Sequence, residues 1–217
     1  YQRDMGIMPD NLQEHIDYTQ WDWHREYNQK VINFLKEQKI KTFIDAGGCT
    51  GEVSLMLLEE IPSITKGIII EPILENYEFI KARITDPRII VINKALYETQ
   101  DTISLGRIDH NVGGHSVLWQ KDNNKHLVEC IKLETLCNEP IDFIKMDIEG
   151  AELNVIENSS ALRNIKFLEI EIHHNTSDFE KLILYFTQFL PNHELIFNSN
   201  NPLTRNVFLV LEETNGA

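Results

Sequence analysis

The sequence has few cysteines, few basic residues and no long apolar run. Its three cysteines, Cys49, Cys130 and Cys137, form no Cys-x-x-Cys pair, so neither a disulfide framework nor a thiolate zinc site is expected. Twenty basic residues against 34 acidic ones give a net charge of −14, which argues against nucleic acid or an anionic membrane surface as a partner. A small-molecule partner fits this charge better, and assembly into a homo-oligomer is left open.

No stretch approaches the roughly 18 apolar residues that a membrane helix needs. The first residues also lack the charged and apolar regions of a signal peptide. Together with the unpaired cysteines, these absences favour a cytoplasmic protein without a membrane segment. The 217 residues, 42% of them hydrophobic, suffice for one α/β domain with a full core and are too few for two.

Strand and helix patterns alternate along most of the chain. Strands are expected at 42–45, 67–71, 88–93, 141–147 and 165–172, and helices at 51–60, 74–85, 151–158 and 178–190. Because parallel neighbours need a crossover helix, this order predicts a Rossmann-like parallel sheet. Two further strands, at 194–197 and 206–211, are joined by a short turn and predict an antiparallel C-terminal edge. The expected fold is thus a seven-stranded, mostly parallel α/β sheet.

Two segments depart from this alternation. Residues 1–40 are expected to form an N-terminal helical segment that packs on the main domain, at 41–217, or serves as a lid over it. At about 97–132, before the fourth strand, short strand patterns replace the expected helix and predict a β-rich insertion. A glycine-rich loop around His115 in this insertion is a candidate substrate lid.

The first strand runs into a glycine-rich turn, and the second strand ends in an acid. Gly47 and Gly51 let the backbone approach a ligand closely, and Glu71 can accept hydrogen bonds from two ribose hydroxyls. The turn lacks the Gly-Lys-Ser/Thr ending of phosphate-binding loops and the Gly-x-Gly-x-x-Gly pattern of dinucleotide sites. Asp45 would repel a diphosphate but suits a cation such as S-adenosylmethionine. A methyltransferase is therefore favoured, with a NAD-dependent oxidoreductase or a catalytically degenerate binding module as alternatives.

A second group of acids surrounds the end of the fourth strand. Asp147 falls at the carboxyl end of this strand, where ligands of open α/β sheets bind, and is expected to border both cofactor and acceptor. Glu149 lies in the following turn, and Glu152 begins a helix, whose dipole favours an acid there. Asp147 is the candidate general base, His173 just past the fifth strand is the other, and Glu149 is expected to orient the acceptor.

The string from Ile144 to Glu152, Ile-Lys-Met-Asp-Ile-Glu-Gly-Ala-Glu, closely resembles the signature of the FkbM-type methyltransferases. Other segments occur in that family's order: 44–47 with Gly51, Glu71-Pro72, Ala95-Leu96, 133–136 and 168–173. The resemblance covers roughly residues 40–175. It implies a class I methyltransferase fold, S-adenosylmethionine as cofactor and O-methylation of a hydroxyl on a sugar or another small molecule.

The resemblance also implies roles for individual residues. The methionine end of the cofactor would be lined by Asp45, Gly47 and Gly51, and its ribose would be held by Glu71. The adenine would be bordered by three residues after the third strand: Asn93, Ala95 and Leu96. The family's usual Asn in the first turn is replaced here by Cys49 or Thr50.

Four side chains near the strand ends are also of the kind that bind a divalent metal: Asp147, Glu149, Glu171 and His173. Hard cations prefer such carboxylate ligands, and several O-methyltransferases use one. No contiguous ligand motif supports a site here, so no metal is predicted.

Overall fold

The structure of this protein is a computed structural model that describes residues 29–106, 125–173, 176–189, 194–198 and 205–210. The strands are β1 (Thr42–Ala46), β2 (Lys66–Ile70), β3 (Ile89–Ile92), β4 (Ala95–Leu96), β5 (Thr102–Gly106), β6 (Lys125–Ile131), β7 (Ile141–Met146), β8 (Ile165–Ile172), β9 (Glu194–Asn198) and β10 (Arg205–Val210). The helices are residues 29–37, α3 (Glu52–Glu60), α4 (Leu74–Arg83), α5 (Leu133–Leu136), α6 (Glu152–Asn158), the 3-10 helix η1 (Ala161–Asn164) and α7 (Thr176–Phe189).

Seven strands form the main sheet, in the order β3-β2-β1-β7-β8-β10-β9. The five strands from β3 to β8 are parallel, whereas β10 pairs antiparallel with both β8 and β9. The predicted Rossmann-like sheet with an antiparallel C-terminal edge is therefore confirmed. The strand order reverses between β1 and β7, and open α/β sheets bind their ligands outside the carboxyl ends of strands at such a point.

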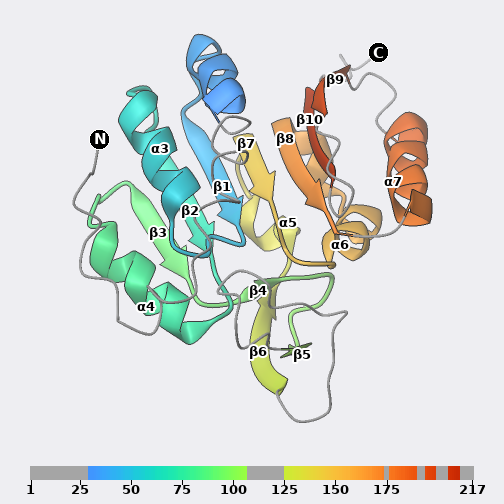
Figure 1. The fold of residues 1–217 in the computed structure, drawn as a ribbon, viewed down its shortest axis with the longest axis horizontal. Coiled ribbons are helices and arrows are strands. Elements are labelled where there is room, and N and C mark those ends of the chain that lie inside the picture. Colours follow the sequence, from blue (N-terminus) through green and yellow to red (C-terminus); the bar gives the residue numbers. More distant parts are fainter. Residues whose placement is uncertain (1–28, 107–124, 174–175, 190–193, 199–204, 211–217) are drawn as a thin grey trace.

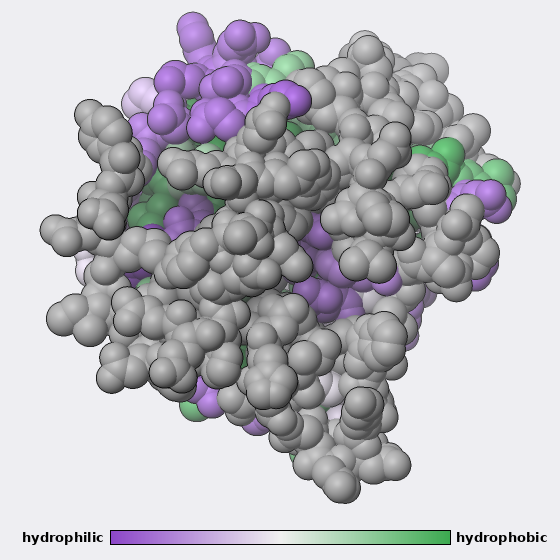
Figure 2. Space-filling model, in the orientation of Figure 1, coloured by the Kyte–Doolittle hydropathy of each residue, from purple (hydrophilic) through white to green (hydrophobic). Residues whose placement is uncertain are grey.

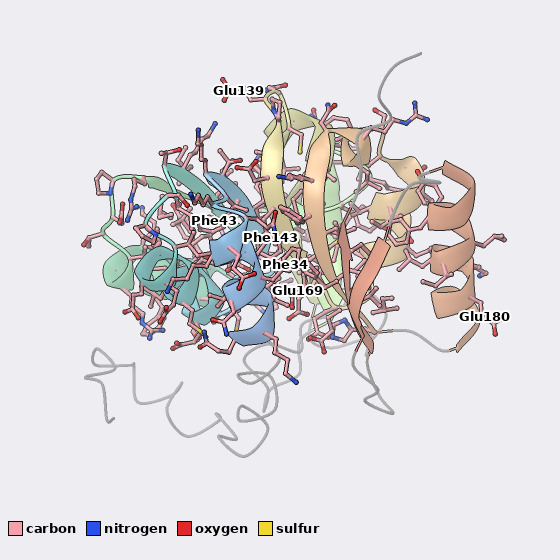
Figure 3. The ribbon with its side chains drawn as sticks, turned by 90° about the horizontal axis from the view of Figure 1, so that it is seen from above. Phe34, Phe43, Glu139, Phe143, Glu169 and Glu180 are labelled. Carbon is pink, nitrogen blue, oxygen red and sulfur yellow. The ribbon has the colours of Figure 1, made fainter. Side chains whose placement is uncertain are left out.

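One face of the sheet is covered by helix 29–37 and α3 (Figure 1). Four buried phenylalanines, one from each of four neighbouring strands, form its core: Phe43, Phe143, Phe167 and Phe208. Phe34 of the helix meets two of these rings edge-on, with centroids 5.6 Å from Phe167 and 5.4 Å from Phe208. Figure 3 shows Phe34, Phe43 and Phe143 gathered where this helix meets the sheet.

The outer side of helix 29–37 is hydrophilic, which explains its position at the surface (top of Figure 2). Lys30, Asn33 and Lys36 are exposed there, while Val31 and Leu35 are buried beneath it. This alternation is the amphipathic pattern of a helix that packs on a core. The earlier part of the predicted N-terminal segment lies outside the described residues. No helix in the described part of the chain is long and apolar enough to cross a membrane.

The opposite face of the sheet is covered by α5, α6 and α7. Leu136, Val155 and Phe186 from these helices join one buried cluster with Ile144 and Leu168 of the sheet. Neighbouring strand residues alternate between this cluster and the phenylalanine core, because successive side chains of a strand point to opposite faces. The central strands are therefore buried on both sides, as expected for a parallel sheet.

The insertion forms a small sheet of its own, in the order β4-β6-β5, below the main sheet in Figure 1. β5 and β6 pair antiparallel, in agreement with the predicted β-rich insertion. The two-residue strand β4 and the four-residue helix α5 were not predicted, because neither is long enough to show a repeating pattern. The candidate lid residue His115 lies outside the described residues.

Candidate functional site

The glycine turn after β1 contacts the ends of the two neighbouring strands, β2 and β7. Gly47 N and the next backbone nitrogen donate to Ile70 O at 2.9 and 3.1 Å, which ties this turn to β2. Gly47 has a φ of +82°, and a Cβ atom there would lie 1.7 Å from Asp147 O. Only glycine fits this approach. The glycine turn therefore abuts the turn after β7, at the point where the strand order reverses.

Glu71 closes this turn from the side of β2. Its Oε2 accepts a hydrogen bond from Cys49 N at 2.8 Å, and its Oε1 accepts from Ile73 N at 2.9 Å and from Asn76 Nδ2 at 3.4 Å. Burial raises the pKa of Glu71 to about 7, although these hydrogen bonds lower it. A carboxylate offers about four acceptor positions, so Oε2 keeps one for a ligand.

A cavity opens between these turns, and residues from the turns after β1, β2 and β7 line it. Five residues from the turns give it a polar wall: Gly47, Cys49, Glu71, Asp147 and Glu149. Apolar side chains form another wall and include Pro72, Ala95, Leu96, Ile103 and Leu105. Two of these, Ile103 and Leu105, belong to β5, so the insertion supplies part of the cavity.

A row of buried charges crosses the sheet behind the cavity. Asp45, Lys145 and Glu169 are register partners on β1, β7 and β8, and all three side chains are buried. Lys145 Nζ lies 3.8 Å from Asp45 Oδ1 and 3.2 Å from Asp147 Oδ2. Ser54 of α3 donates to the other oxygen of Asp45 at 2.7 Å. Lys145 thus links an acid of the first turn to the acid after β7.

Burial and neighbouring charges shift the pKa values of these residues in opposite directions. Burial lowers the pKa of Lys145, but the carboxylates of Asp147 and Asp45 outweigh it and raise that pKa. Burial raises the pKa of Glu169 to about 8, against the opposing effect of Lys145. Lys145 is therefore held as a cation. Its charge balances that of Asp45 and Asp147.

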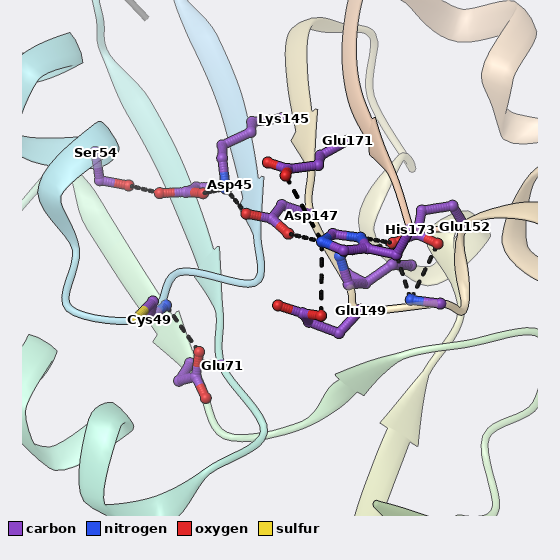
Figure 4. Close-up of polar contacts among 12 residues, drawn as sticks. Asp45, Cys49, Ser54, Glu71, Lys145, Asp147, Glu149, Glu152, Glu171 and His173 are labelled. Carbon is purple, nitrogen blue, oxygen red and sulfur yellow. Dashed lines mark hydrogen bonds and ion pairs between the residues drawn. The ribbon is translucent and has the colours of Figure 1, made fainter. Parts of the chain in front are cut away.

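His173 lies where β8 ends and faces four carboxylates (Figure 4). Its Nδ1 lies 3.0 Å from Glu152 Oε1. On its other side, Nε2 lies 3.5 Å from Glu149 Oε2, and 3.7 Å from both Asp147 Oδ1 and Glu171 Oε1. Burial alone would lower the pKa of His173, but the bond to Glu152 and the charges of Asp147 and Glu149 raise it to about 10. The ring is therefore an imidazolium at neutral pH.

The cluster around His173 has the composition of a cation site. One ligand atom each from Asp147, Glu149 and His173 lie within 4.8 Å of one another, so the three predicted side chains do come together. The imidazolium of His173 itself supplies a positive charge among these acids. Burial raises the pKa of Glu149 to about 8, with His173 acting against it, and Glu149 has a strained φ of +51°.

Comparison with known proteins identifies the family of this chain. Residues 45–197 match the methyltransferase FkbM domain. The chain belongs to the FkbM methyltransferase family. This family assignment agrees with the predicted S-adenosylmethionine-dependent methyltransferase and favours it over the alternative of a NAD-dependent oxidoreductase. No curated protein is similar enough to this methyltransferase to count as a relative.

Three solved structures share the fold of this FkbM methyltransferase. The methyltransferase FkbM from Methylobacillus flagellatus KT is 21% identical, with a TM-score of 0.58 over 79% of this chain and 44% of that one. The delta-N METTL16 MTase domain is 11% identical, with a TM-score of 0.55 over 88% and 83% of the two chains. TrmK of M. capricolum, in complex with S-adenosyl-homocysteine, is 10% identical, with a TM-score of 0.51 over 80% and 63%. This chain thus spans less than half of the Methylobacillus protein.

The cavity of this FkbM methyltransferase fits the cofactor in three respects. The buried Glu71 keeps an acceptor position on Oε2 for a ribose hydroxyl. Apolar side chains at Ala95 and Leu96 offer a surface for adenine. The acids of the polar wall suit a ligand with a sulfonium and an ammonium group.

The predicted residues divide into two sets. Six line the cavity: Gly47, Glu71, Ala95, Leu96, Asp147 and Glu149. Four do not line it: Asp45, Gly51, Asn93 and His173. Asn93 Nδ2 donates to Glu71 O at 2.9 Å and to Pro72 O at 3.0 Å, so its amide fixes the turn after β2. A direct contact of Asp45, Gly51 and Asn93 with the cofactor stays a prediction, and so does the catalytic role of His173.

Several residues of the site were missed or left undecided. Cys49 rather than Thr50 lines the cavity and has a φ of +48°, a conformation in which Asn is enriched, which explains the family's Asn at this turn. Burial raises the pKa of the Cys49 thiol to about 12, so the thiol stays neutral. Lys145 was missed. The sequence does mark it, because it is a charged residue between the apolar Ile144 and Met146 near the end of a strand.

Proposed function

We propose that this FkbM methyltransferase transfers the methyl group of S-adenosylmethionine to a hydroxyl of a sugar or another small molecule. The observation that supports this most is the position of Asp147, which lines the cofactor cavity and touches the cluster around His173. The cofactor supplies an electrophilic methyl group whose bond to sulfur breaks with the electron pair left on sulfur. The acceptor oxygen forms the new bond to carbon and gives up its proton to the protein.

Asp147 is the proposed acceptor of this proton. At pH 7 the imidazole of His173 is already protonated, with its pKa raised to about 10. Glu149, with its pKa raised to about 8, also carries its proton at that pH. Asp147 is left as a cavity-lining carboxylate with two basic groups beside it, Lys145 Nζ at 3.2 Å and His173 Nε2 at 3.7 Å. The protonated Glu149 donates a hydrogen bond and orients the acceptor oxygen.

The methyl transfer itself needs alignment more than chemistry from the protein. The close approach of Gly47 to the carbonyl of Asp147 fixes the proton acceptor against the donor side of the cavity. The apolar wall from Ile103 and Leu105 keeps water away from that side. The small-molecule acceptor would enter over the acids of the polar wall.

The experiment measures transfer of a radioactive methyl group from S-adenosylmethionine to a panel of methyl hexosides and phenols. We expect the wild type to methylate at least one hydroxyl in the panel. Asp147→Asn should lower kcat by about 10²–10⁴-fold, the usual contribution of a general base, with the Kd of S-adenosyl-homocysteine within about twofold of the wild type. Full turnover by Asp147→Asn would remove Asp147 from this role.

Glu149→Gln is the matched variant, because a glutamine imitates the protonated carboxyl. Its activity at pH 7 should stay within about tenfold of the wild type. In the wild type, activity should fall above pH 8 as Glu149 ionises, and this fall should be absent from Glu149→Gln. A wild-type profile that instead rises through pH 8 would make Glu149 the base and contradict the assignment to Asp147.

A further inference from the structure

Glu152 makes contacts that a helix-start acid does not need. Its side chain is 1% exposed, and its Oε1 accepts hydrogen bonds from Ile148 N at 3.3 Å and Gly150 N at 3.1 Å. Oε2 accepts from Gly150 N as well, at 3.0 Å. These bonds hold the turn between β7 and α6. The bond to His173, 21 residues away at the end of β8, serves neither the turn nor the helix.

The hydrogen of that bond belongs to the histidine. Both oxygens of Glu152 already act as acceptors of backbone N–H groups, so they are placed to accept rather than to donate. His173 Nδ1 must therefore be the donor at 3.0 Å. The ring cannot turn over without losing this bond, so Nε2 is aimed at the acids on the other side.

Those acids include two that line the cavity, Asp147 and Glu149. Nε2 faces Glu149 Oε2 at 3.5 Å and Asp147 Oδ1 at 3.7 Å, and it faces Glu171 Oε1 at 3.7 Å from within β8. Glu152 thus holds the groups of the cavity in two ways: through the backbone of the turn that carries Asp147 and Glu149, and through the imidazole that faces them.

We propose that Glu152 is a positioning residue that anchors His173 through Nδ1 and fixes Asp147 and Glu149 in the geometry needed for proton removal from the acceptor. The inference rests on the proposed function. Partners of this kind, which orient the side chains that touch the reacting groups, typically contribute 10–100-fold to activity where they have been removed. Glu152 touches neither donor nor acceptor in this arrangement, since it does not line the cavity.

The test is a double-mutant cycle between Glu152→Gln and His173→Gln, with kcat measured on the fastest acceptor of the panel. Each single variant should lower kcat by about 10–100-fold while the KM for S-adenosylmethionine stays within about twofold. Glu152→Gln keeps an oxygen acceptor for the backbone N–H groups of the turn, so the lost contact is the one to His173, and the double variant should be no slower than the slower single one. Additive losses, or a loss in Glu152→Gln that appears only as reduced donor binding, would overturn the proposal.

Two further variants separate positioning from folding. Glu134→Gln is the control, because Glu134 also lies in the first turn of a helix and accepts a backbone N–H, that of Ser160 at 2.9 Å, away from the cavity. It should leave kcat unchanged. Glu152→Asp keeps the charge and should restore part of the activity. If Glu152→Gln does not fold, Glu152→Asp still decides, since unchanged kcat in a variant with a shortened side chain would contradict positioning.

Nitrogen NMR of His173 tells the two proposals apart. In the wild type the ring should show both nitrogens protonated at pH 7, and Glu152→Gln should shift the Nδ1 signal and lower the pKa of His173. The remaining acids that face the ring, Asp147, Glu149 and Glu171, are unchanged in this variant. A wild type that methylates no hydroxyl refutes the proposed function, whereas an Nδ1 signal that does not respond refutes the role of Glu152.

Discussion

Replacing Gly47 with alanine tests the contact between the two turns at the switch point. The new Cβ atom would lie 1.7 Å from Asp147 O, about half of an ordinary van der Waals distance. One of the two turns must therefore move by well over 1 Å. Because a misplacement of about 1 Å at a reacting group can cost about 100-fold in rate, kcat of Gly47→Ala should fall by about 100-fold or more.

Gly51→Ala is the matched control, because it carries the same backbone strain without that collision. Gly51 has a φ of +80°, and its Cβ atom would meet Ile84 Cδ1 at 2.9 Å, the end of a side chain that can move. Both variants should lose about 1–2 kcal/mol of stability from the left-handed conformation. For a domain of this size that loss lowers Tm by about 2–8 °C.

The assay combines thermal unfolding with calorimetric titration of S-adenosyl-homocysteine. Gly47→Ala should bind at least about tenfold more weakly than Gly51→Ala, a difference of about 1.4 kcal/mol, since the altered turn belongs to the cavity wall only at Gly47. Equal affinity of the two variants would show that the contact between Gly47 and Asp147 does not shape the donor site, and the reasoning would be refuted.

Three further changes test the site and the core. The affinity for S-adenosyl-homocysteine should rise about tenfold between pH 6 and pH 8, because Glu71, with its pKa raised to about 7, must ionise to accept a ribose hydroxyl. Glu71→Gln should flatten this profile in titration calorimetry. Lys145→Met should cost about 3–5 kcal/mol in urea unfolding, because it leaves the buried Asp45 without the cation that it shares with the half-buried Asp147. Phe208→Ala should cost about 3–5 kcal/mol in the same assay through the cavity left among the core rings, with the Kd of S-adenosyl-homocysteine unchanged in the folded fraction.

Much of the fold follows from local patterns in the sequence. The strands that become β1, β2 and β7 are largely apolar runs followed by acids or glycines, and such runs separated by helix patterns leave few alternatives to a parallel sheet. Element ends were less predictable. α3 begins at Glu52 rather than at Gly51 because Gly51 adopts a left-handed conformation, which the sequence alone does not specify.

Site residues that follow directly after a strand could be predicted from the sequence. Contacts between residues far apart in the sequence could not. Glu71 and Asp147 follow directly from strand patterns, and both line the cavity. The contact of Glu152 with His173 joins two elements, and no local period encodes it. The same holds for Ile103 and Leu105, whose place in the cavity depends on how the small sheet docks.

Strand β5 of the small sheet lines the cavity, and this has consequences for engineering and for divergence within the family. A protein engineer who grafts a foreign segment in place of residues 97–132 to change the acceptor would also remove Ile103 and Leu105 from the wall of the donor site. Chimeras of this kind should therefore lose cofactor affinity along with their old acceptor, unless two apolar residues are kept at these positions of β5. Donor affinity and acceptor choice can evolve independently only in variants that preserve this pair.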